Sequence, residues 1–325
     1  MRIDVHTHVF SPNPAFYELL DRLNLHVLNI CVLDKHNPVY QSLEDQEVAA
    51  IETFRAGRGR VAWCSSFDPD SWESPGFAAR VVAHLNKTFD EGAIAVKIYK
   101  IIGMELKSRD GKYLMPDDPV FVPIFEAIQA RNKTLYTHLA EPSSAWQPLN
   151  PVSIHYGYYK NNPDWHMYLH PERPAKETIL AARDHLLERH PKLRVVGAHL
   201  GSMEDDVGQI AKRLDRYPNF AVETAARVPD LMIQPRDKVR SFLIRYQDRV
   251  LYGTDLSMRP SQNPEEAVKE WEAVYTRDWK FFATTETLEY GGRKVSGLAL
   301  PKPVLRKFYR DNAIRWLPGI EGAQK

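Results

Sequence analysis

The 325-residue sequence predicts a closed (β/α)₈ barrel, that is, a TIM barrel of the α/β class. Eight short apolar, β-branched segments recur along the chain, and stretches with apolar residues at three- and four-residue spacing follow them. This alternation is typical of parallel strands joined by crossover helices. The length also fits a barrel of about 250 residues with insertions. An open doubly wound sheet is less favoured, because no G-x-G-x-x-G follows the first segment.

The apolar segments define the expected strands in chain order. They are residues 3–9, 27–33, 61–67, 93–99, 134–140, 194–200, 220–226 and 249–255. The expected helices are residues 44–55, 76–89, 120–131, 176–188, 203–214 and 236–246. Gly57 and Gly92 are suitable helix ends, and Ser202 with Asp205 resembles a capping box before the helix at 203–214. The local sequence therefore supports each predicted strand and helix.

Two stretches are longer than ordinary connections. Residues 142–174, here called the aromatic insertion, separate strands five and six and are rich in Tyr, Trp and His. Ordered loops of this length are usually lids, binding loops or subunit contacts. Residues 257–300, the C-terminal extension, contain Gly291-Gly292 between polar and β-forming residues, which predicts a hairpin over 289–295. We expect both stretches to belong to one barrel domain spanning 1–325.

Composition excludes several functional classes. The 43 basic and 42 acidic residues leave a net charge of +1, which argues against a nucleic-acid binder that relies on bulk charge. No apolar run approaches the ~20 residues of a membrane span, and His6 and His8 interrupt any signal-peptide core. Cys31 and Cys64 alone cannot form a disulfide framework. A cytoplasmic protein is the expectation, unless an export signal has been removed.

His6 and His8 form an H-x-H pair on the first strand. Side chains alternate along a strand, so both imidazoles point to the same face. Two imidazoles on a rigid element suit a divalent metal such as zinc. The pair alone is also compatible with two polar residues at a strand end.

The other strands supply matching residues at the same level. His138, His199 and Asp255 lie at the carboxyl-terminal ends of strands five, six and eight. In a barrel these ends form the rim that carries the active site. Together with the H-x-H pair they provide enough ligands for a catalytic metal with room for water. Placing so many ionisable groups at one level for packing alone would be costly.

This residue set resembles the amidohydrolase superfamily, and more narrowly its amidohydrolase-2 branch, which includes metal-dependent hydrolases, lactonases and non-oxidative decarboxylases. The most specific matching segments are Ile-Asp-Val-His-Thr-His at 3–8, Gly-Ala-His-Leu-Gly at 197–201 and Tyr-Gly-Thr-Asp at 252–255. The resemblance covers nearly the whole barrel, from residue 3 to residue 315. Because the H-x-H pair falls so early in this sequence, we do not expect the strands that precede the barrel in urease-like branches, which favours the amidohydrolase-2 branch.

The resemblance implies roles for these residues. His6, His8 and His138 would bind one divalent metal, with Zn²⁺ as the expected ion, and Asp255 would be a further ligand or the proton-handling base. His199 would polarise a substrate carbonyl or hold an oxyanion. The metal would lower the pKa of its bound water toward ~7. Asp255 would then accept the proton of that water and deliver it to the leaving group.

Lys97 on strand four has three readings. As a carboxylated lysine it would bridge a second metal ion held by His138 and His199. Otherwise it meets an anionic substrate, or it is a structural cation outside the chemistry. Arg227 at the end of strand seven either clamps a carboxylate bidentately or is a surface residue. Since Lys97, Arg227 and Arg259 all lie toward one rim, we expect a small carboxylic acid as substrate.

Tyr156 and Trp165 of the aromatic insertion also have two readings. They would stack on a planar substrate and exclude water, or they would pack in a subunit interface. A homodimer is the expected assembly. No nucleic-acid or membrane partner is expected.

The leading functional hypothesis is a metal-dependent hydrolase that cleaves an amide, ester or lactone bond. The alternative is a carboxy-lyase, in which Asp255 protonates the carbon that loses CO₂ and no water attacks. A third hypothesis is a catalytically silent barrel used for binding. The retention of every expected ligand argues against that third hypothesis.

Overall fold

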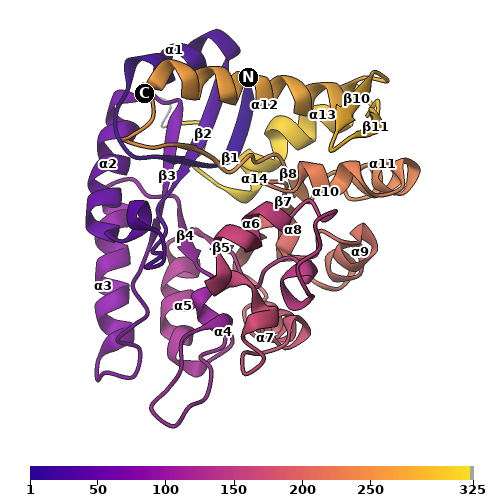
Figure 1. The fold of residues 1–325 in the computed structure, drawn as a ribbon. Helices are drawn as coiled ribbons and strands as arrows, with labels where there is room; N and C mark the ends of the chain where they lie inside the picture. Colours follow the sequence, from indigo (N-terminus) through magenta and orange to yellow (C-terminus); the bar gives the residue numbers. More distant parts are fainter. Residues whose placement is uncertain (323–325) are drawn as a thin grey trace.

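In the computed structural model, which describes residues 1–322, the eight predicted strand segments form one curled parallel sheet (Figure 1). The strands are β1 (Arg2–Val9), β2 (Leu25–Ile30), β3 (Val61–Ser66), β4 (Ala95–Ile98), β5 (Thr134–Thr137), β6 (Arg194–Gly197), β7 (Phe220–Glu223), β8 (Val250–Leu251) and β9 (Leu256–Met258). The last three residues of the expected 1–325 domain lie outside the described residues. Strands β2, β5, β6 and β7 each end three residues before the corresponding apolar segment does.

The sheet closes because the eighth strand is divided in two. Within residues 1–322 the strand order is β8-β7-β6-β5-β4-β3-β2-β1-β9, so β8 pairs with β7 whereas β9 pairs with β1. Between the two halves, the amide of Val5 donates to Tyr252 O at 2.9 Å, and the amide of Asp255 donates to His6 O at 2.8 Å. The predicted (β/α)₈ barrel is therefore confirmed.

Helices separate the strands and cover the outside of the sheet (Figure 1). The α-helices are α1 (Pro14–Leu23), α2 (Leu43–Ala56), α3 (Phe77–Asp90), α4 (Ile101–Met104), α5 (Val122–Ala130), α6 (Tyr156–Asn161), α7 (Lys176–Arg189), α8 (Ala198–Gly201), α9 (Val207–Arg216), α10 (Val228–Met232), α11 (Arg236–Arg245), α12 (Pro264–Ala283), α13 (Lys302–Arg306) and α14 (Asn312–Trp316). The short helical turns are η1 (Pro38–Tyr40), η2 (Pro119–Phe121), η3 (Ser143–Trp146), η4 (Pro163–Trp165), η5 (Met167–Leu169) and the π-helical η6 (Lys307–Asp311).

All six expected helices are present, but α9 begins later than expected. Asp206 is its N-cap and accepts from the amide of Gly208 at 2.7 Å. The capping box expected at Ser202 is wrong, because Ser202 has a left-handed φ of 58° and its hydroxyl donates to Ala140 O. The helix therefore begins four residues further along the chain than the capping box at Ser202 predicts.

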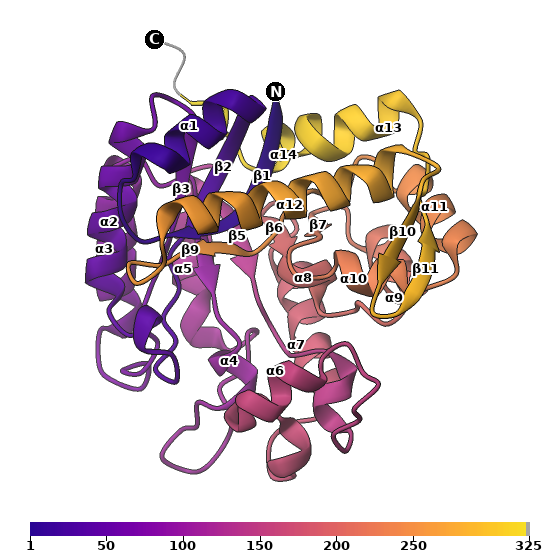
Figure 2. The same cartoon turned by 45° about the horizontal axis from the view of Figure 1, so that its top comes forward.

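The C-terminal extension contains the predicted hairpin and one helix that was not predicted. Strands β10 (Thr287–Tyr290) and β11 (Arg293–Ser296) are antiparallel, and Gly291 and Gly292 both have positive φ, as a tight hairpin turn requires. The unpredicted helix α12 lies alongside α1 (Figure 2). There Trp271 packs edge-on against Phe16, with ring centroids 5.5 Å apart.

The barrel interior is divided into an apolar lower part and a polar upper part. Apolar strand residues such as Val5 and Leu28 fill the lower part, and Trp316 and Leu317 from the C-terminal end of the chain close it. Buried histidines and carboxylates occupy the upper part. None of the helices in residues 1–322 combines the length and apolarity of a membrane span. The fold thus leaves one polar region, at the carboxyl-terminal rim.

Candidate metal centre

Four of the strand ends at this rim carry a left-handed residue that is not glycine. They are Ala140 (φ 65°), His199 (φ 55°), Ala226 (φ 54°) and Asp255 (φ 67°). Non-glycine residues adopt this conformation rarely, and such strain concentrates at functional sites. The sequence predicted that His199 and Asp255 lie inside strands. This prediction was wrong, because β6 ends at Gly197 and β8 ends at Leu251. A left-handed residue breaks the strand ladder, so each side chain lies just beyond it.

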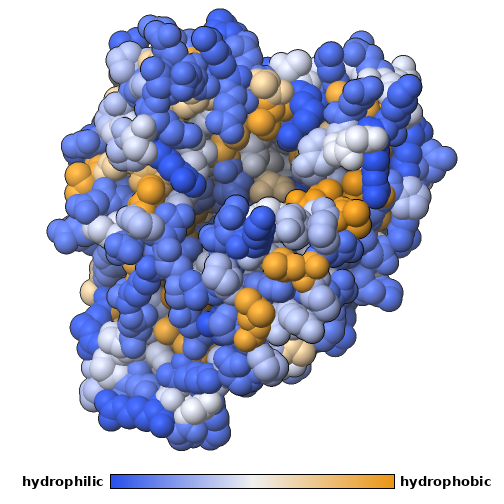
Figure 3. Space-filling model, in the orientation of Figure 1, coloured by the Kyte–Doolittle hydropathy of each residue, from blue (hydrophilic) through white to orange (hydrophobic). Residues whose placement is uncertain are grey.

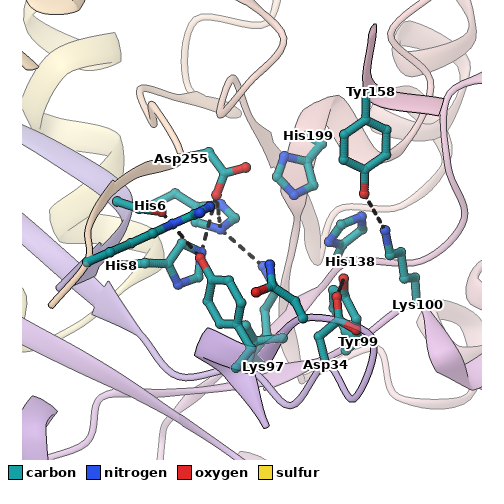
Figure 4. A pocket seen from close by; sticks show the side chains of 15 residues that line it. His6, His8, Asp34, Lys97, Tyr99, Lys100, His138, Tyr158, His199 and Asp255 are labelled. Atoms are coloured by element: carbon teal, nitrogen blue, oxygen red, sulfur yellow. Dashed lines mark hydrogen bonds and ion pairs between the residues drawn. The ribbon is translucent and has the colours of Figure 1, made fainter. Parts of the chain in front are cut away.

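His6, His8 and Asp255 form the first cluster of possible metal ligands (Figure 4). The Nε2 atoms of His6 and His8 lie 3.4 and 3.2 Å from Oδ1 of Asp255. Both histidines are buried, whereas the Asp255 side chain is 31% exposed. One carboxylate oxygen therefore lies between two imidazole nitrogens on the open side of the cluster.

His138 and His199 lie next to this cluster. Their ring centroids are 4.2 Å apart, and the ring of His199 is 4.9 Å from that of His6. Nε2 of His138 is buried and has no hydrogen-bond partner within residues 1–322. A buried polar nitrogen without a hydrogen-bond partner costs folding free energy, which indicates that a bound ion or ligand completes the site. The structure thus brings together all five residues that the sequence selected for the metal and the catalytic roles.

Three of the histidines are oriented by contacts on their far side. Nδ1 of His6 lies 3.0 Å from Oε1 of Glu223, Nδ1 of His8 lies 2.8 Å from Ile30 O, and Nδ1 of His199 lies 2.9 Å from Ala225 O. Because these acceptors take an Nδ1 proton, the Nε2 lone pairs remain for a ligand. Such outer contacts fix tautomer and ring orientation in metal sites.

The electrostatics of the site favour the neutral form of His6, His138 and His199 and the charged form of Asp255. Burial, together with the nearby Lys97 cation, holds the pKa of His6 well below its usual value. Burial also lowers the pKa of His138 and His199. Burial alone would raise the pKa of Asp255, but the His6 and His8 imidazoles hold it well below its usual value. Neutral imidazole and ionised carboxylate are the forms that bind metals.

Lys97 lies inside this cluster. Its Nζ is 3.3 Å from Nε2 of His6, and the residue is 1% exposed. Burial lowers the pKa of Lys97 to about 8, against the opposing effect of Asp255. A side chain so placed can reach a metal ion or a substrate bound at His6.

The donor set fits one divalent ion. Three to four imidazole nitrogens and a carboxylate are ligands that zinc accepts, and among residues 1–322 no protein group satisfies Nε2 of His138. His6, His8 and Asp255 satisfy the spacing of a ligand group by themselves, as do His6, His199 and Glu223. The same residues therefore leave both a one-ion and a two-ion arrangement open.

The centre opens into a cavity of about 220 Å³. Its wall adds residues from the loops after β2 and β4, from β9 and the residue after it, and from the aromatic insertion: Val32, Asp34, Asn37, Tyr40, Tyr99, Lys100, Tyr158, Ser257 and Arg259. The surface drawn in Figure 3 is hydrophilic over most of its area and is hollowed near its centre. A cavity of this size with so many polar groups suits a small, polar molecule.

Only one of the four residues predicted to bind substrate lines the cavity. Lys97 lines the cavity, whereas Arg227, Tyr156 and Trp165 do not. Nη1 of Arg227 donates to Ala226 O, and its buried Nε has no partner within residues 1–322. Trp165 is buried behind the cavity wall, where its ring lies 4.0 Å from Nζ of Lys100.

The sequence interpretation missed Glu223 and Asp4. Besides His6, Glu223 accepts from the amide of His199 at 2.8 Å. Asp4 accepts from the amides of His6 and Thr254, and burial raises its pKa to about 7. A carboxylate within an otherwise apolar strand is the signal that marks both residues: Asp4 lies near the start of β1 and Glu223 ends β7. Gly253 is also required, since a Cβ there would lie 2.5 Å from Oε2 of Glu223 and 3.1 Å from Cβ of His6.

A closed barrel with histidines and a carboxylate gathered at its carboxyl-terminal rim has the architecture of metal-dependent barrel enzymes. The comparison of the sequence with protein families agrees: the amidohydrolase family matches residues 3–319, so the chain belongs to this family. Members of the family generally bind a metal ion. No curated protein matches the chain in sequence.

Solved structures with the same fold include enzymes of different reaction types. 2,6-Dihydroxybenzoate decarboxylase from Rhizobium is 15% identical, with a TM-score of 0.54, over 97% of this chain and 98% of that chain. 4-Oxalomesaconate hydratase from Rhodopseudomonas palustris is 12% identical, with a TM-score of 0.54, over 98% and 96%. A probable 2-pyrone-4,6-dicarboxylic acid hydrolase from Acinetobacter baumannii is 12% identical, with a TM-score of 0.50, over 97% and 98%. These similarities establish the fold, and both hydrolases and decarboxylases share it.

Proposed function

We propose that this protein is a metal-dependent hydrolase that cleaves an amide, ester or lactone bond in a small carboxylic acid derivative. The observation that carries the proposal is the position of Asp255. Its Oδ1 lies 3.2 to 3.4 Å from two imidazole nitrogens, and its side chain is partly exposed to the cavity. An ionised carboxylate in that position can bind a metal ion and also accept a proton from water beside it.

His6, His8, His138 and Asp255 would hold one divalent ion, with zinc as the expected metal. When bound, the ion would act as a Lewis acid that polarises substrate oxygen and makes nearby water more acidic. The fit rests on the donor set and on the unpartnered Nε2 of His138. In this arrangement Lys97 is a substrate contact. A second ion bridged by carboxylated Lys97 remains the alternative.

The residues of the chain handle the protons. Asp255 would take a proton from the attacking water and deliver it to the leaving group. With its Nδ1 proton donated to Ala225 O, neutral His199 presents the Nε2 lone pair. His199 would therefore stabilise an oxyanion only after it has accepted a proton. This ordering refines the role that the family resemblance implies for His199.

The charges around the cavity support an acidic substrate. Lys97 and Arg259 line the cavity, and neither has a carboxylate within salt-bridge distance in residues 1–322. Arg227 lies behind the wall with an unpartnered Nε. We propose that Lys97 contacts a substrate carboxylate and that Arg227 contributes positive potential. Substrate stacking on Tyr156 and Trp165 would require the aromatic insertion to move.

Non-oxidative decarboxylation is the second candidate, and the position of Lys97 favours it. An ammonium group 3.3 Å from His6 and close to Asp255 can hold the carboxylate that leaves as CO₂. Asp255 would then protonate the carbon instead of handling the proton of a water. The ligand set is the same for both reactions, so the products must distinguish them.

The first experiment is elemental analysis of protein purified without chelators or a metal-binding tag. One divalent ion per chain, lost in His6→Ala and His138→Ala, supports the proposed centre. Two ions support a bridging Lys97, and no ion after reconstitution overturns the metal-dependent reaction. Turnover of a panel of lactones, esters, amides and aromatic acids in ¹⁸O-labelled water then assigns the reaction. Label in a product carboxylate indicates hydrolysis, whereas CO₂ release with solvent deuterium on carbon indicates decarboxylation.

A further inference from the structure

The aromatic insertion contributes one side chain to the cavity wall, and it is Tyr158. This residue lies in α6, in the long connection between β5 and β6. Although the residue is 44% exposed, its hydroxyl oxygen lies 3.1 Å from Nζ of Lys100, which follows β4 (Figure 4). Both residues line the cavity that contains the metal centre.

Lys100 is a fixed buried cation. It is 1% exposed and forms an ion pair with Glu141, whose other oxygen accepts from the Tyr159 hydroxyl at 2.9 Å. The ring of Trp165 lies 4.0 Å from its ammonium group, which is a favourable cation–π distance. Since protein groups surround Lys100 on several sides, its position does not depend on a ligand.

The hydroxyl of Tyr158 is a hydrogen-bond donor without an acceptor. An ammonium group can only donate, so the Tyr158 oxygen is the acceptor in its contact with Lys100. Within residues 1–322 no group accepts the proton of this hydroxyl. Burial raises the pKa of Tyr158 despite the neighbouring cation, so the proton stays in place at neutral pH. A hydroxyl that accepts from a cation is a stronger donor to an anion.

We propose that Tyr158, held and polarised by Lys100, binds an anionic oxygen of the substrate away from the reacting bond. Figure 4 shows the Lys100–Tyr158 pair on the other side of His138 and His199 from Asp255. A substrate that reaches both ends carries one oxygen group at the metal centre and a carboxylate at Tyr158. The preferred substrates are therefore derivatives of small dicarboxylic acids. The identity of the reaction rests on the proposed function, but the carboxylate subsite can be tested without turnover.

The experiment compares the binding of succinate and succinamate to zinc-loaded protein by calorimetry. Both probes offer one carboxylate to the metal centre, but the second end is an anion only in succinate. We expect the wild type to prefer succinate, and Tyr158→Phe to reduce that preference about tenfold, as the loss of one hydrogen bond to a charged group predicts. Tyr156→Phe removes a hydroxyl from the same helix, outside the cavity, and should leave the preference unchanged.

Two results would overturn the subsite. One is a wild type without any preference for succinate. The other is a Tyr158→Phe protein that keeps the wild-type preference for succinate, including one that binds both probes more weakly by the same factor because Tyr158 only fastens the aromatic insertion. The proposed function fails separately: Tyr158-dependent binding of succinate without hydrolysis of any ester, lactone or amide keeps the subsite and rejects the hydrolase. Hydrolysis by the wild type, together with an unchanged preference for succinate in Tyr158→Phe, keeps the hydrolase and rejects the subsite.

Discussion

The side chains of His6 and Glu223, which are 217 positions apart in the chain, meet inside the barrel with Nδ1 3.0 Å from Oε1. The same Glu223 oxygen accepts from the backbone amide of His199 at 2.8 Å. One buried carboxylate thus orients a ligand histidine from β1 and fixes the turn that carries His199. This contact connects the first strand of the barrel with the seventh, so the geometry of the metal centre depends on closure of the whole sheet.

Glu223→Gln is expected to weaken metal binding about 10- to 100-fold, because outer contacts to ligand histidines usually contribute that much. The amide keeps one oxygen as an acceptor but loses the charge that favours the Nδ1–H tautomer of His6. Competition against a chelating dye measures the affinity, and circular dichroism checks the fold. Unchanged affinity in a folded variant would show that Glu223 serves packing only.

Asp255→Asn should lower turnover by at least about 100-fold while the fold persists, since proton transfer by a positioned side chain contributes roughly 10²–10⁴-fold. The variant must be assayed at saturating zinc, because Asp255 is also a proposed ligand. Metal content, measured on the same sample, separates loss of the ion from loss of the base. Near-wild-type turnover at full metal occupancy would reject the proton-transfer role.

The contact of His84 with Glu47 predicts a pH-dependent contribution to stability. His84 Nε2 lies 3.1 Å from Oε1 of Glu47, and this hydrogen bond raises the pKa of His84 above its ordinary 6.5. A raised pKa in the folded state stabilises the protein below pH 6.5, and this stabilisation is lost as the pH rises through the folded-state pKa. The pair is partly exposed, so the effect is at most about 1 kcal/mol.

Urea unfolding of the wild type and His84→Gln at pH 6 and pH 9 measures this contribution. The difference in unfolding free energy between the two proteins should be larger at pH 6 than at pH 9. A difference that is equal at both pH values, or larger at pH 9, would contradict the assignment.

We propose that the chain forms a homodimer through the outer surface of the aromatic insertion. Val152, Tyr168 and Leu169 expose 80%, 52% and 55% of their area there. Light scattering should give twice the 37.4 kDa chain mass, and Val152→Glu with Leu169→Glu should give the monomer mass. Val48→Glu changes a valine on α2 that is 53% exposed, close to the 55% of Leu169, and serves as the control. A wild type that runs as a monomer, or a double variant that stays dimeric, contradicts this surface.

The strands and the five proposed site residues could be predicted because both depend on local pattern. Apolar β-branched segments mark strands, and the end of a strand marks the rim, so His138, His199 and Asp255 follow directly. Glu223 could not be assigned in this way, because its partner His6 is reached only through barrel closure. The left-handed backbone at Ala140 and Ala226 could not be predicted either, since alanine, unlike glycine or asparagine, is not a residue type that indicates this conformation.

The errors in the aromatic insertion and the C-terminal extension have simple physical origins. Tyr156 and Tyr158 are two positions apart on a helix, where a rotation of about 200° separates their directions. Only one of them can face the cavity. The sequence does not show which side of this helix faces the cavity, so it does not show which tyrosine does. Helix α12 begins with Asn263 as N-cap followed by Pro264, which is a recognisable start signal. Treating the extension as a connection hid that signal.

The divided eighth strand has a consequence for biosynthesis. Among the barrel strands β1 is made first, but one of its two edges is paired only by residues near 255. Before residue 255 is translated, His6 and His8 belong to a strand with one unpaired edge. During this time the Asp255 carboxylate does not yet exist. The complete metal centre therefore assembles only after residue 255 has been made, and a shorter nascent chain lacks the Asp255 carboxylate. Throughout that interval the open edge is available to chaperones and to mispairing.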